Sequence, residues 1–436
     1  FAQVLNKVGK EVPTITDAAK FKTAFNTLQQ LIKEGKIAAG HDIGSGGLIT
    51  TLLEMSFAEV NLGAEYDLSA LGEEDTIKLL FAENIALVVQ ADAEVETAFK
   101  ANGINHTMIG HPKEGTTVSI KNGNTDLSFD IEKTRDTWFR TSYLLDQKQS
   151  GKQKATERFD NYKHQPLVFD FPKHFTGEIL TPAGIARPKA AIIREKGSNS
   201  EREMANAMYL AGFDVKDVHM TDLISGRETL EDIQFIGAVG GFSNSDVLGS
   251  AKGWAGAFLY NEKARTALEN FFKREDTLSV GICNGCQLFI ELGLINPDHD
   301  TKPRMLHNQS GKHESGFTSV TIQENNSVML STLAGSKLGV WISHGEGRFD
   351  LPYTEDRYNI VAKYAYNGYP ANPNGSHFDI AMMASDNGRH LVMMPHIERS
   401  IFQWNWAYYP EGRTDKVSPW HEAFVNARKW IEGRNS

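Results

Sequence analysis

The chain has 436 residues, of which 40% are hydrophobic and 23% are charged, and its formal net charge is −10 at pH 7. This length predicts two or three domains, and the acidic balance excludes a general nucleic-acid-binding protein, which needs a basic face. No stretch offers the roughly 18 uncharged apolar residues that predict a membrane-spanning helix. Two cysteines exclude a disulfide scaffold and indicate a reducing, cytoplasmic setting. Because the sequence starts at Phe1, we interpret it as a piece of a longer protein.

Residues 1–145 are predicted to form an α+β domain. Apolar residues at helical spacing in TITDAAKFKTAFNTLQQLIKEGK predict a helix with Thr16 or Asp17 as its cap. The glycine-rich GHDIGSGGL precedes a second helix, and AEVETAFKANG predicts a short helix that ends at Gly103. LLFAENIALVVQA predicts a buried strand, and TTVSIKNGNTDLSFDI predicts a hairpin about an Asn-Gly turn.

The next segment, residues 146–186, is predicted to be a linker. Its first part, DQKQSGKQKATERFDNYKHQ, is polar and has no clean apolar face, so we expect only partial helix there. The segment ends near TPAGIARPK.

Residues 187–436 alternate strand and helix patterns, which predicts an α/β domain with a parallel sheet covered on both faces. The strands are predicted in KAAIIRE, VKDVHM, IQFIGAVGGF and TLSVGI, and the helices in NSEREMANAMYLAGF, ARTALENFFKRE and CNGCQLFIELG. Three later strands, in FTSVTIQ, LGVWISH and RHLVMMPH, are expected to complete the sheet.

Both cysteines lie in SVGICNGCQLFIELG, at the junction of a predicted strand and a predicted helix. A zinc site normally needs two such pairs, and the sequence has only one. A dithiol redox pair is one reading, because such pairs also begin a helix after a strand. The other reading is a nucleophile elbow, in which Gly281 and Gly285 permit a sharp turn and Cys283 lies above the helix amino terminus. Cys286 then lies one helical turn further and packs against the sheet.

Two other segments fit the nucleophile reading. His396 and Glu398 follow the apolar run HLVMM, and a carboxylate two residues after a histidine can orient the imidazole as a general base. Gly240 and Gly241 end another predicted strand, where free backbone N–H groups can stabilise an oxyanion. Together these residues predict a Cys-His-Glu hydrolytic site. Each motif taken alone has a simpler reading, because a lone G-x-C-x-G is a weak signal and a lone histidine at a strand end is more often structural.

At this point the sequence resembles a known family. GICNGCQ, HGEGR, YPANPNGS and MMPHIER resemble the class I glutamine amidotransferase domain of the phosphoribosylformylglycinamidine synthase family of purine biosynthesis, over residues 187–436. The resemblance implies a flavodoxin-like parallel sheet. It also implies that Cys283 attacks the carboxamide of glutamine, that His396 transfers the proton and that Glu398 holds His396.

The same resemblance implies further site residues. The backbone N–H groups of Gly241 or Phe242 and of Asn284 would form the oxyanion hole, and Gln287 would contact glutamine. His344 would bind substrate or line the ammonia route, in the company of Asn308, Glu346 and Arg348. The glutaminase site would need no cofactor.

HDIGSGGLITTLLEMSFAE resembles a segment of the aminoimidazole ribonucleotide synthetase superfamily, so residues 1–145 are expected to be the carboxy-terminal domain of a second ATP-binding-type repeat in a large single-chain enzyme. Ser45 stands where that family often has an acidic residue, which implies a degenerate nucleotide site, and Asp42 remains as a candidate metal ligand. The complete enzyme would use ATP and Mg²⁺ to convert formylglycinamide ribonucleotide to the amidine. Its other partners would be the missing amino-terminal domains of the same polypeptide, with no nucleic acid and no membrane.

Two rival functions remain open. One is a dithiol oxidoreductase that uses Cys283 and Cys286, and the other is a catalytically silent regulatory module. Alkylation of Cys283 alone by a glutamine analogue such as diazo-oxonorleucine would separate the amidotransferase from the first rival. A glutaminase assay would separate it from the second.

Overall fold

The computed structural model describes residues 1–9, 12–164, 167–180 and 187–435. It divides the chain into two compact units, Phe1–Ser142 and Tyr143–Ser436. None of the helices within the described ranges has the length and hydropathy that crossing a lipid bilayer requires. The predicted end of the linker, residues 181–186, lies outside the described residues.

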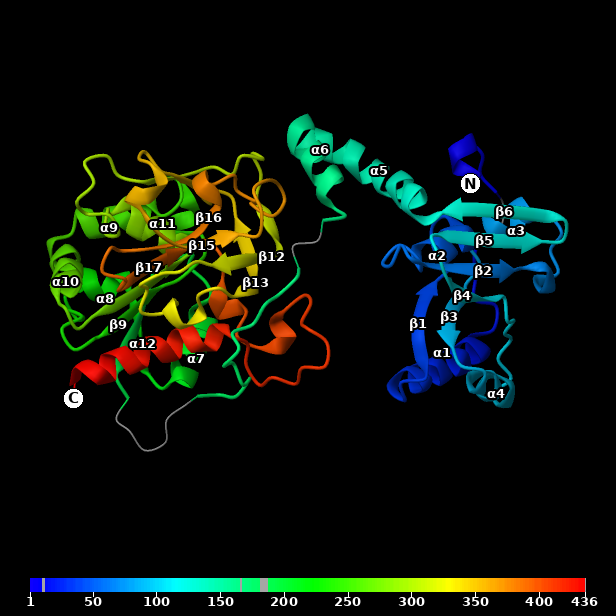
Figure 1. Cartoon of the computed structure of the whole chain (residues 1–436), viewed down its shortest axis with the longest axis horizontal. Helices are drawn as coiled ribbons and strands as arrows, with labels where there is room; N and C mark the ends of the chain where they lie inside the picture. The colour runs from blue at the N-terminus through cyan, green and yellow to red at the C-terminus, as the bar shows by residue number, and fades with distance from the viewer. Residues whose placement is uncertain (10–11, 165–166, 181–186, 436) are drawn as a thin grey trace. The chain divides into compact units, whose positions relative to one another are not determined.

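The first unit is an α+β structure, drawn in blue to cyan in Figure 1. Two sheets are present in it, an antiparallel β1–β3 pair and a four-stranded sheet of order β4-β2-β5-β6. Its elements are α1 (Ala18–Lys33), β1 (Ile37–Asp42), α2 (Gly47–Glu54), β2 (Leu62–Asp67), α3 (Thr76–Leu80), β3 (Leu87–Ala91), α4 (Glu94–Ala101), β4 (Gly110–Glu114), β5 (Thr117–Asn122) and β6 (Thr125–Asp130).

Most of the predicted elements of this unit are confirmed. The Asp17 side chain caps α1 by accepting from the N–H of Lys20, and β5 and β6 form the expected hairpin about Gly123, whose φ is +58°. The prediction of one buried strand over LLFAENIALVVQA is wrong, because its first leucines belong to α3 and the strand starts only at Leu87. The reason is Asp75, whose side chain accepts from two backbone N–H groups and starts a helix there.

The first part of the segment predicted to be a linker, from residue 146, is more helical than expected, and a long helix leads into it. The two helices are α5 (Ile131–Gln149) and α6 (Gly151–Asn161). A buried carboxylate explains this order, because Asp146 accepts from Ser150 at 2.6 Å, from Arg158 at 2.9 Å and from Lys312 at 3.4 Å. Ion pairs and hydrogen bonds thus hold this polar sequence, together with the contact between the Tyr143 and Phe159 rings and the burial of Ala155.

The second unit is built on a nine-stranded sheet of order β13-β12-β15-β16-β17-β10-β9-β7-β8. Five neighbouring strands are parallel, as predicted: β7 (Lys189–Arg194), β8 (Asp214–His219), β9 (Phe235–Ala238), β10 (Leu278–Ile282) and β17 (His390–Met393). The other four run antiparallel: β12 (Glu314–Ile322), β13 (Lys337–His344), β15 (Asn359–Tyr364) and β16 (Ile380–Ala384). The predicted parallel sheet is therefore present, and the later strands extend it in antiparallel fashion, since they are joined without crossover helices. A separate antiparallel pair consists of β11 (Arg304–Leu306) and β14 (Arg348–Asp350).

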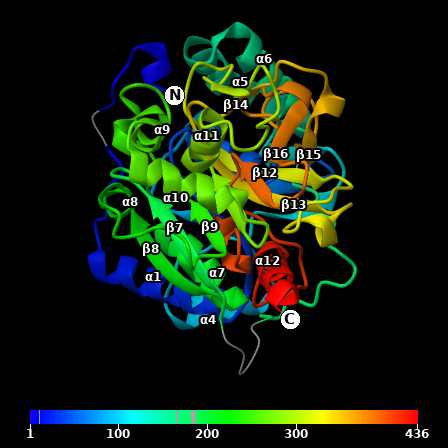
Figure 2. The same ribbon diagram turned by 90° about the vertical axis from the view of Figure 1, so that its left-hand side faces the viewer.

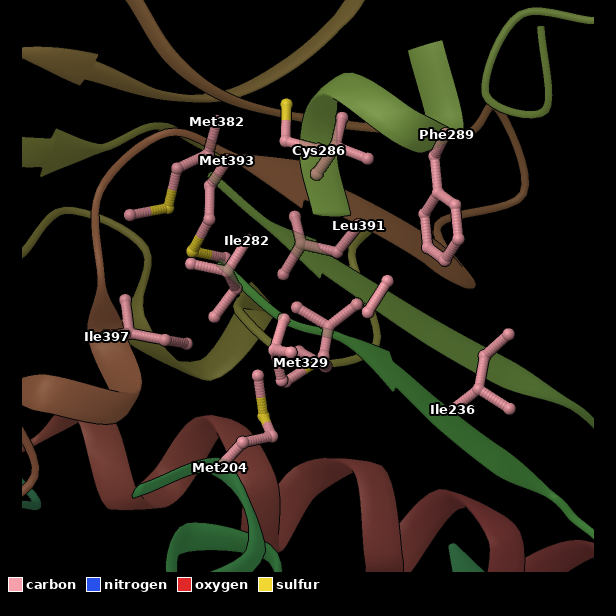
Figure 3. Packing of buried hydrophobic residues seen from close by; sticks show 14 of the residues in the cluster. Met204, Ile236, Ile282, Cys286, Phe289, Met329, Met382, Leu391, Met393 and Ile397 are labelled. Atoms are coloured by element: carbon pink, nitrogen blue, oxygen red, sulfur yellow. The ribbon is translucent and has the colours of Figure 1, made fainter. Parts of the chain in front are cut away.

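Helices cover both faces of this sheet. They are α7 (Glu201–Ala211), α8 (Met220–Ser225), α9 (Lys252–Leu259), α10 (Glu262–Lys273), α11 (Asn284–Glu291) and α12 (Trp420–Asn435). Figure 1 and Figure 2 show α7 and α12 together on one side of the sheet and α9 and α11 on the other. Figure 3 shows the core between these layers, with Cys286 and Phe289 of α11 on one side of the strands and Met204 of α7 on the other.

The segment before β7 also belongs to this unit. The backbone of Asp170 exchanges two hydrogen bonds with Lys337 of β13, at 2.8 and 2.9 Å. The rings of Phe169 and Phe171 contact Trp406, with centroids 5.1 and 5.6 Å apart.

Candidate active site

The turn between β10 and α11 holds Cys283 in a strained conformation. Its φ is +53° and its ψ is −107°, a combination that costs free energy for a residue with a side chain. The two flanking glycines are required sterically. A Cβ on Gly285 would lie 2.0 Å from the carbonyl oxygen of Ala238 in β9, and a Cβ on Gly281 would lie 2.6 Å from the Gly285 oxygen. The predicted elbow is therefore present, and it places Cys283 at the carboxyl end of the parallel strands.

His396 and Glu398 follow β17 at the same edge of the sheet. The His396 Nδ1 lies 2.6 Å from the Glu398 Oε1, and both side chains are buried. The His396 backbone N–H donates to the Trp341 oxygen at 2.8 Å, which fixes the loop against β13. Burial alone would lower the pKa of His396, but the Glu398 charge and the neighbouring Cys283 thiol raise it to about 10. The carboxylate therefore stabilises an imidazolium, as a general base requires once it has taken a proton.

Gly240 lies between the histidine ring and the cysteine. A Cβ added to Gly240 would lie 2.7 Å from the His396 Cε1 and 3.4 Å from the Cys283 Cβ. The two side chains thus approach each other across a position that has no room for a side chain. The Cys283 Sγ also donates to the Ser343 oxygen at 3.5 Å, at the end of β13.

The loop after β9 supplies the predicted backbone donors. The Phe242 N–H donates to the Gly197 oxygen at 2.9 Å, so Gly241 is the better candidate donor in this conformation. Gly241 has a φ of +126°, and a Cβ there would lie 2.5 Å from the Ser198 Cα. Only glycine fits this close approach of two loops.

A pocket opens over these groups. Its lining consists of Asn199, Gly241, Phe242, Asp246, Ser250, Cys283, Gln287, Ser343, His344, Gly345, His396 and Arg399. Most of the predicted contact residues are thus brought together. Asn284 lies just beneath, where its side chain donates to Gln287 at 2.9 Å and accepts from the Ser243 N–H at 3.1 Å. The Gln287 amide in turn donates to the backbone oxygen of Glu346 at 2.7 Å. The Asn284 and Gln287 amides thus link the loops around the pocket through hydrogen bonds.

His344 is buried at this pocket with 2% of its surface exposed. Its Nδ1 lies 3.1 Å from the Asn308 Oδ1. Burial, with smaller effects of His396 and His313, lowers the pKa of His344 to about 3, so the ring is neutral. Asn308, Glu346 and Arg348 do not line the pocket themselves.

Sequence reasoning missed several lining residues. Asp246 and Ser250 follow the predicted strand that ends at Gly241, and the pKa of Asp246 is raised by burial and by the nearby Glu346. The signal that could have revealed them was their place in the loop that also carries the glycine donors. Ser343 contributes a backbone oxygen, for which the sequence holds no signal.

The second cysteine has a different environment. Cys286 has no exposed surface and lies on the sheet-facing helix α11 among the buried hydrophobic residues that Figure 3 draws, as the sequence predicted. Burial, with a smaller effect of Cys283, raises the pKa of the Cys286 thiol well above its usual range. Both cysteines are free. This environment favours a single nucleophile over a dithiol pair.

The candidate metal ligand in the first unit is isolated. The Asp42 side chain is 79% exposed and lies 3.7 Å from the ring of His41. Within the described ranges, no group of three or more His, Cys, Asp or Glu side chains is arranged to hold a metal ion. Asp42 as a metal ligand stays a prediction.

Comparison with known proteins gives two family matches. Residues 187–431 match the CobB/CobQ-like glutamine amidotransferase domain, and residues 2–121 match the carboxy-terminal domain of AIR synthase related proteins. The chain is 39% identical to a protein of Arabidopsis thaliana named probable phosphoribosylformylglycinamidine synthase, chloroplastic/mitochondrial, over 99% of this chain and 32% of the relative. It is 36% identical to the phosphoribosylformylglycinamidine synthase of Homo sapiens, over 99% of this chain and 35% of that protein.

The chain therefore spans about a third of the length of these relatives. Among solved structures, PurLQS from Thermotoga maritima is 25% identical with a TM-score of 0.44, and the match covers 58% of this chain and all of that one.

Proposed function

Because the chain belongs to the CobB/CobQ-like glutamine amidotransferase family, we propose that its second unit hydrolyses glutamine to glutamate and ammonia at Cys283. The observation that carries this proposal is the strained Cys283 turn beside the buried His396–Glu398 pair. A thiol, a base and a carboxylate that orients the base are the parts that nucleophilic acyl transfer needs.

In the reactive form the Cys283 proton is on His396, as the raised pKa of this histidine favours, and the thiolate sulfur attacks the carboxamide carbon. The oxyanion of the tetrahedral intermediate accepts from the N–H groups of Gly241 and Asn284. His396 then returns the proton to the nitrogen, the carbon–nitrogen bond breaks, and ammonia leaves a glutamyl thioester. Water gives a proton to the now neutral histidine and hydrolyses the thioester to glutamate, which restores the thiolate and the imidazolium. Glu398 stabilises the imidazolium at each transfer.

We further propose that the complete protein uses this ammonia in the ATP-dependent conversion of formylglycinamide ribonucleotide to formylglycinamidine ribonucleotide. Support comes from the names of the two relatives, each matched over 99% of this chain, and from the match of residues 2–121 to the AIR synthase related family. The missing two thirds of such a protein would supply most of the ATP and nucleotide sites. Exposed Asp42 and the neighbouring Ser45 do not fit a complete Mg²⁺ site, so no step is assigned to metal in this chain.

The test uses the full-length protein with Cys283→Ala, and with Cys286→Ala as the matched control. Cys283→Ala is expected to abolish synthesis of the amidine from glutamine and to spare synthesis from high ammonium, because ammonia bypasses the thiol. Retained glutamine-dependent synthesis would show that Cys283 is not the nucleophile. Labelling by diazo-oxonorleucine at Cys286 would instead favour the dithiol rival, and absence of any glutaminase activity in the wild type would favour the silent module.

A further inference from the structure

The side chain of Asn308 has only one orientation that satisfies its neighbours. Its Nδ2 donates to the backbone oxygens of Lys312 at 3.0 Å and His344 at 2.6 Å. Its Oδ1 accepts from the backbone N–H of Gly347 at 3.0 Å. An amide turned the other way would set an N–H against an N–H and an oxygen against two oxygens.

This orientation decides the tautomer of His344. The Asn308 Oδ1 faces the His344 Nδ1 at 3.1 Å and is an acceptor, so the Nδ1 must carry the ring proton. The Nε2 then presents a lone pair. The ring cannot turn over freely, because a Cβ on Gly347 would lie only 2.4 Å from the Nδ1, which shows how closely the backbone packs on it.

The lone pair has no partner within the described residues. The His344 Nε2 is buried and has no hydrogen-bond partner in the described part of the chain. The residue is only 2% exposed, and it lines the pocket that holds Cys283 and His396. An unpaired buried acceptor costs free energy, and such a group is retained where a ligand completes its hydrogen bonding. The end of β13 that carries it also contacts the Cys283 side chain through the Ser343 oxygen and the His396 backbone N–H through the Trp341 oxygen.

We propose that the His344 Nε2 accepts a hydrogen bond from the carboxamide nitrogen of the substrate and holds the ammonia formed from it. This inference rests on the proposed glutaminase function. A carboxamide has an acceptor oxygen and a donor nitrogen, and the pocket that holds Cys283 is lined both by Gly241, a backbone N–H donor, and by His344, which carries this acceptor. His344 takes no proton: His396 gives its proton to the nitrogen, the carbon–nitrogen bond breaks, and the product ammonia keeps one N–H directed at the Nε2. Asn308 is a positioning residue that fixes the tautomer.

The experiment compares two substrates in the full-length protein, glutamine and the γ-methyl ester of glutamate. The ester has no N–H to donate, so the acceptor matters only for glutamine. His344→Ala is expected to lower kcat/KM for glutamine about tenfold, the value of one hydrogen bond, and to change kcat/KM for the ester less than twofold. His344→Gln, whose side-chain oxygen can replace the acceptor, is expected to recover part of the loss. His390→Gln, at a second buried histidine of the same sheet, is the matched control.

If His344→Ala lowers kcat/KM equally for both substrates, so that the ratio of the two values is unchanged, His344 is merely structural and the proposal is overturned. Labelling of Cys283 by diazo-oxonorleucine, which also lacks an amide N–H, should continue in each folded variant. If the wild type itself neither reacts with this reagent nor hydrolyses glutamine, it is the proposed function that fails.

A second readout tests the tautomer. Asn308→Asp places a carboxylate beside the Nδ1 and should raise the pKa of His344, so the Nε2 becomes a donor at neutral pH. His396 and His313 act on this ring in the opposite direction and limit the rise, and the Cys283 thiol lines the same pocket. Glutamine hydrolysis by this variant should be weak at low pH and recover as pH rises, and the ester reaction should lack that added acid limb. The same pH profile for both substrates would contradict the assigned role.

Discussion

Gly240 offers the most direct test of the site geometry. Gly240→Ala adds one methyl group that would lie 2.7 Å from the His396 Cε1. Carbon atoms normally meet at about 3.5–4.0 Å, so the ring must move by about 1 Å. A displacement of about 1 Å at a catalytic group costs about 10²-fold in rate. We therefore expect kcat for glutamine hydrolysis to fall about 100-fold, with a destabilisation of about 1–3 kcal/mol from the tighter packing.

The matched control is Gly316→Ala in β12, where an added Cβ has no atom within 4 Å. Both variants should fold, as judged by circular dichroism and urea unfolding, and only Gly240→Ala should lose glutamine hydrolysis and slow the labelling of Cys283. Equal activity in the two variants would refute the proximity of Cys283 and His396 on which the proposed mechanism depends.

Three further predictions concern charge and reactivity. Cys286→Ala should keep glutaminase activity within about threefold of wild type, because Cys286 is a core residue, and mass spectrometry should find the glutamine analogue on Cys283 alone. Glu398→Gln should lower the free energy of unfolding near neutral pH, because the charge of Glu398 stabilises the protonated His396 ring in the folded chain. The difference from wild type should shrink as pH rises towards 10, since a raised His396 pKa stabilises the fold only while the imidazole is protonated. Urea unfolding of both proteins at several pH values measures it. Burial lowers the pKa of His390 to about 3, so the unfolded chain binds one more proton between pH 4 and 6. His390→Gln should therefore flatten the fall in unfolding free energy over that range by about 1.4 kcal/mol per pH unit, measured by urea titration at several pH values.

The elbow could be read from sequence because its requirements are local. Gly281 and Gly285 flank Cys283 at fixed spacing, and the clashes that a Cβ would cause at both are properties of one turn. The parallel strands were likewise predictable from alternation of strand and helix patterns. The antiparallel direction of the later strands β12, β13, β15 and β16 was not predictable. The pattern of a strand does not reveal whether the chain enters it from the same end of the sheet as the strand before.

Order in the polar segment after residue 130 depends on partners distant in sequence. Asp146 is stabilised by Lys312, 166 positions away, and no local pattern can reveal such a pair. The same holds for the Asn308–His344 contact, since the family resemblance placed both residues near the site but no local pattern pairs the two side chains. The cytoplasmic location of this protein also stays a prediction. The name of the Arabidopsis thaliana relative places that relative in an organelle, the chloroplast or mitochondrion.

The pairing of Asp170 with Lys337 has a practical consequence for dissecting this protein. The family match begins at residue 187, so a fragment cut there would lack Asp170, Phe169 and Phe171. It would leave the outer strand β13 with unpaired backbone groups and would bare the Trp406 ring. Open strand edges and exposed aromatic surface promote aggregation. The smallest fragment of this unit that stays in solution is therefore expected to begin well upstream of the boundary that sequence similarity marks.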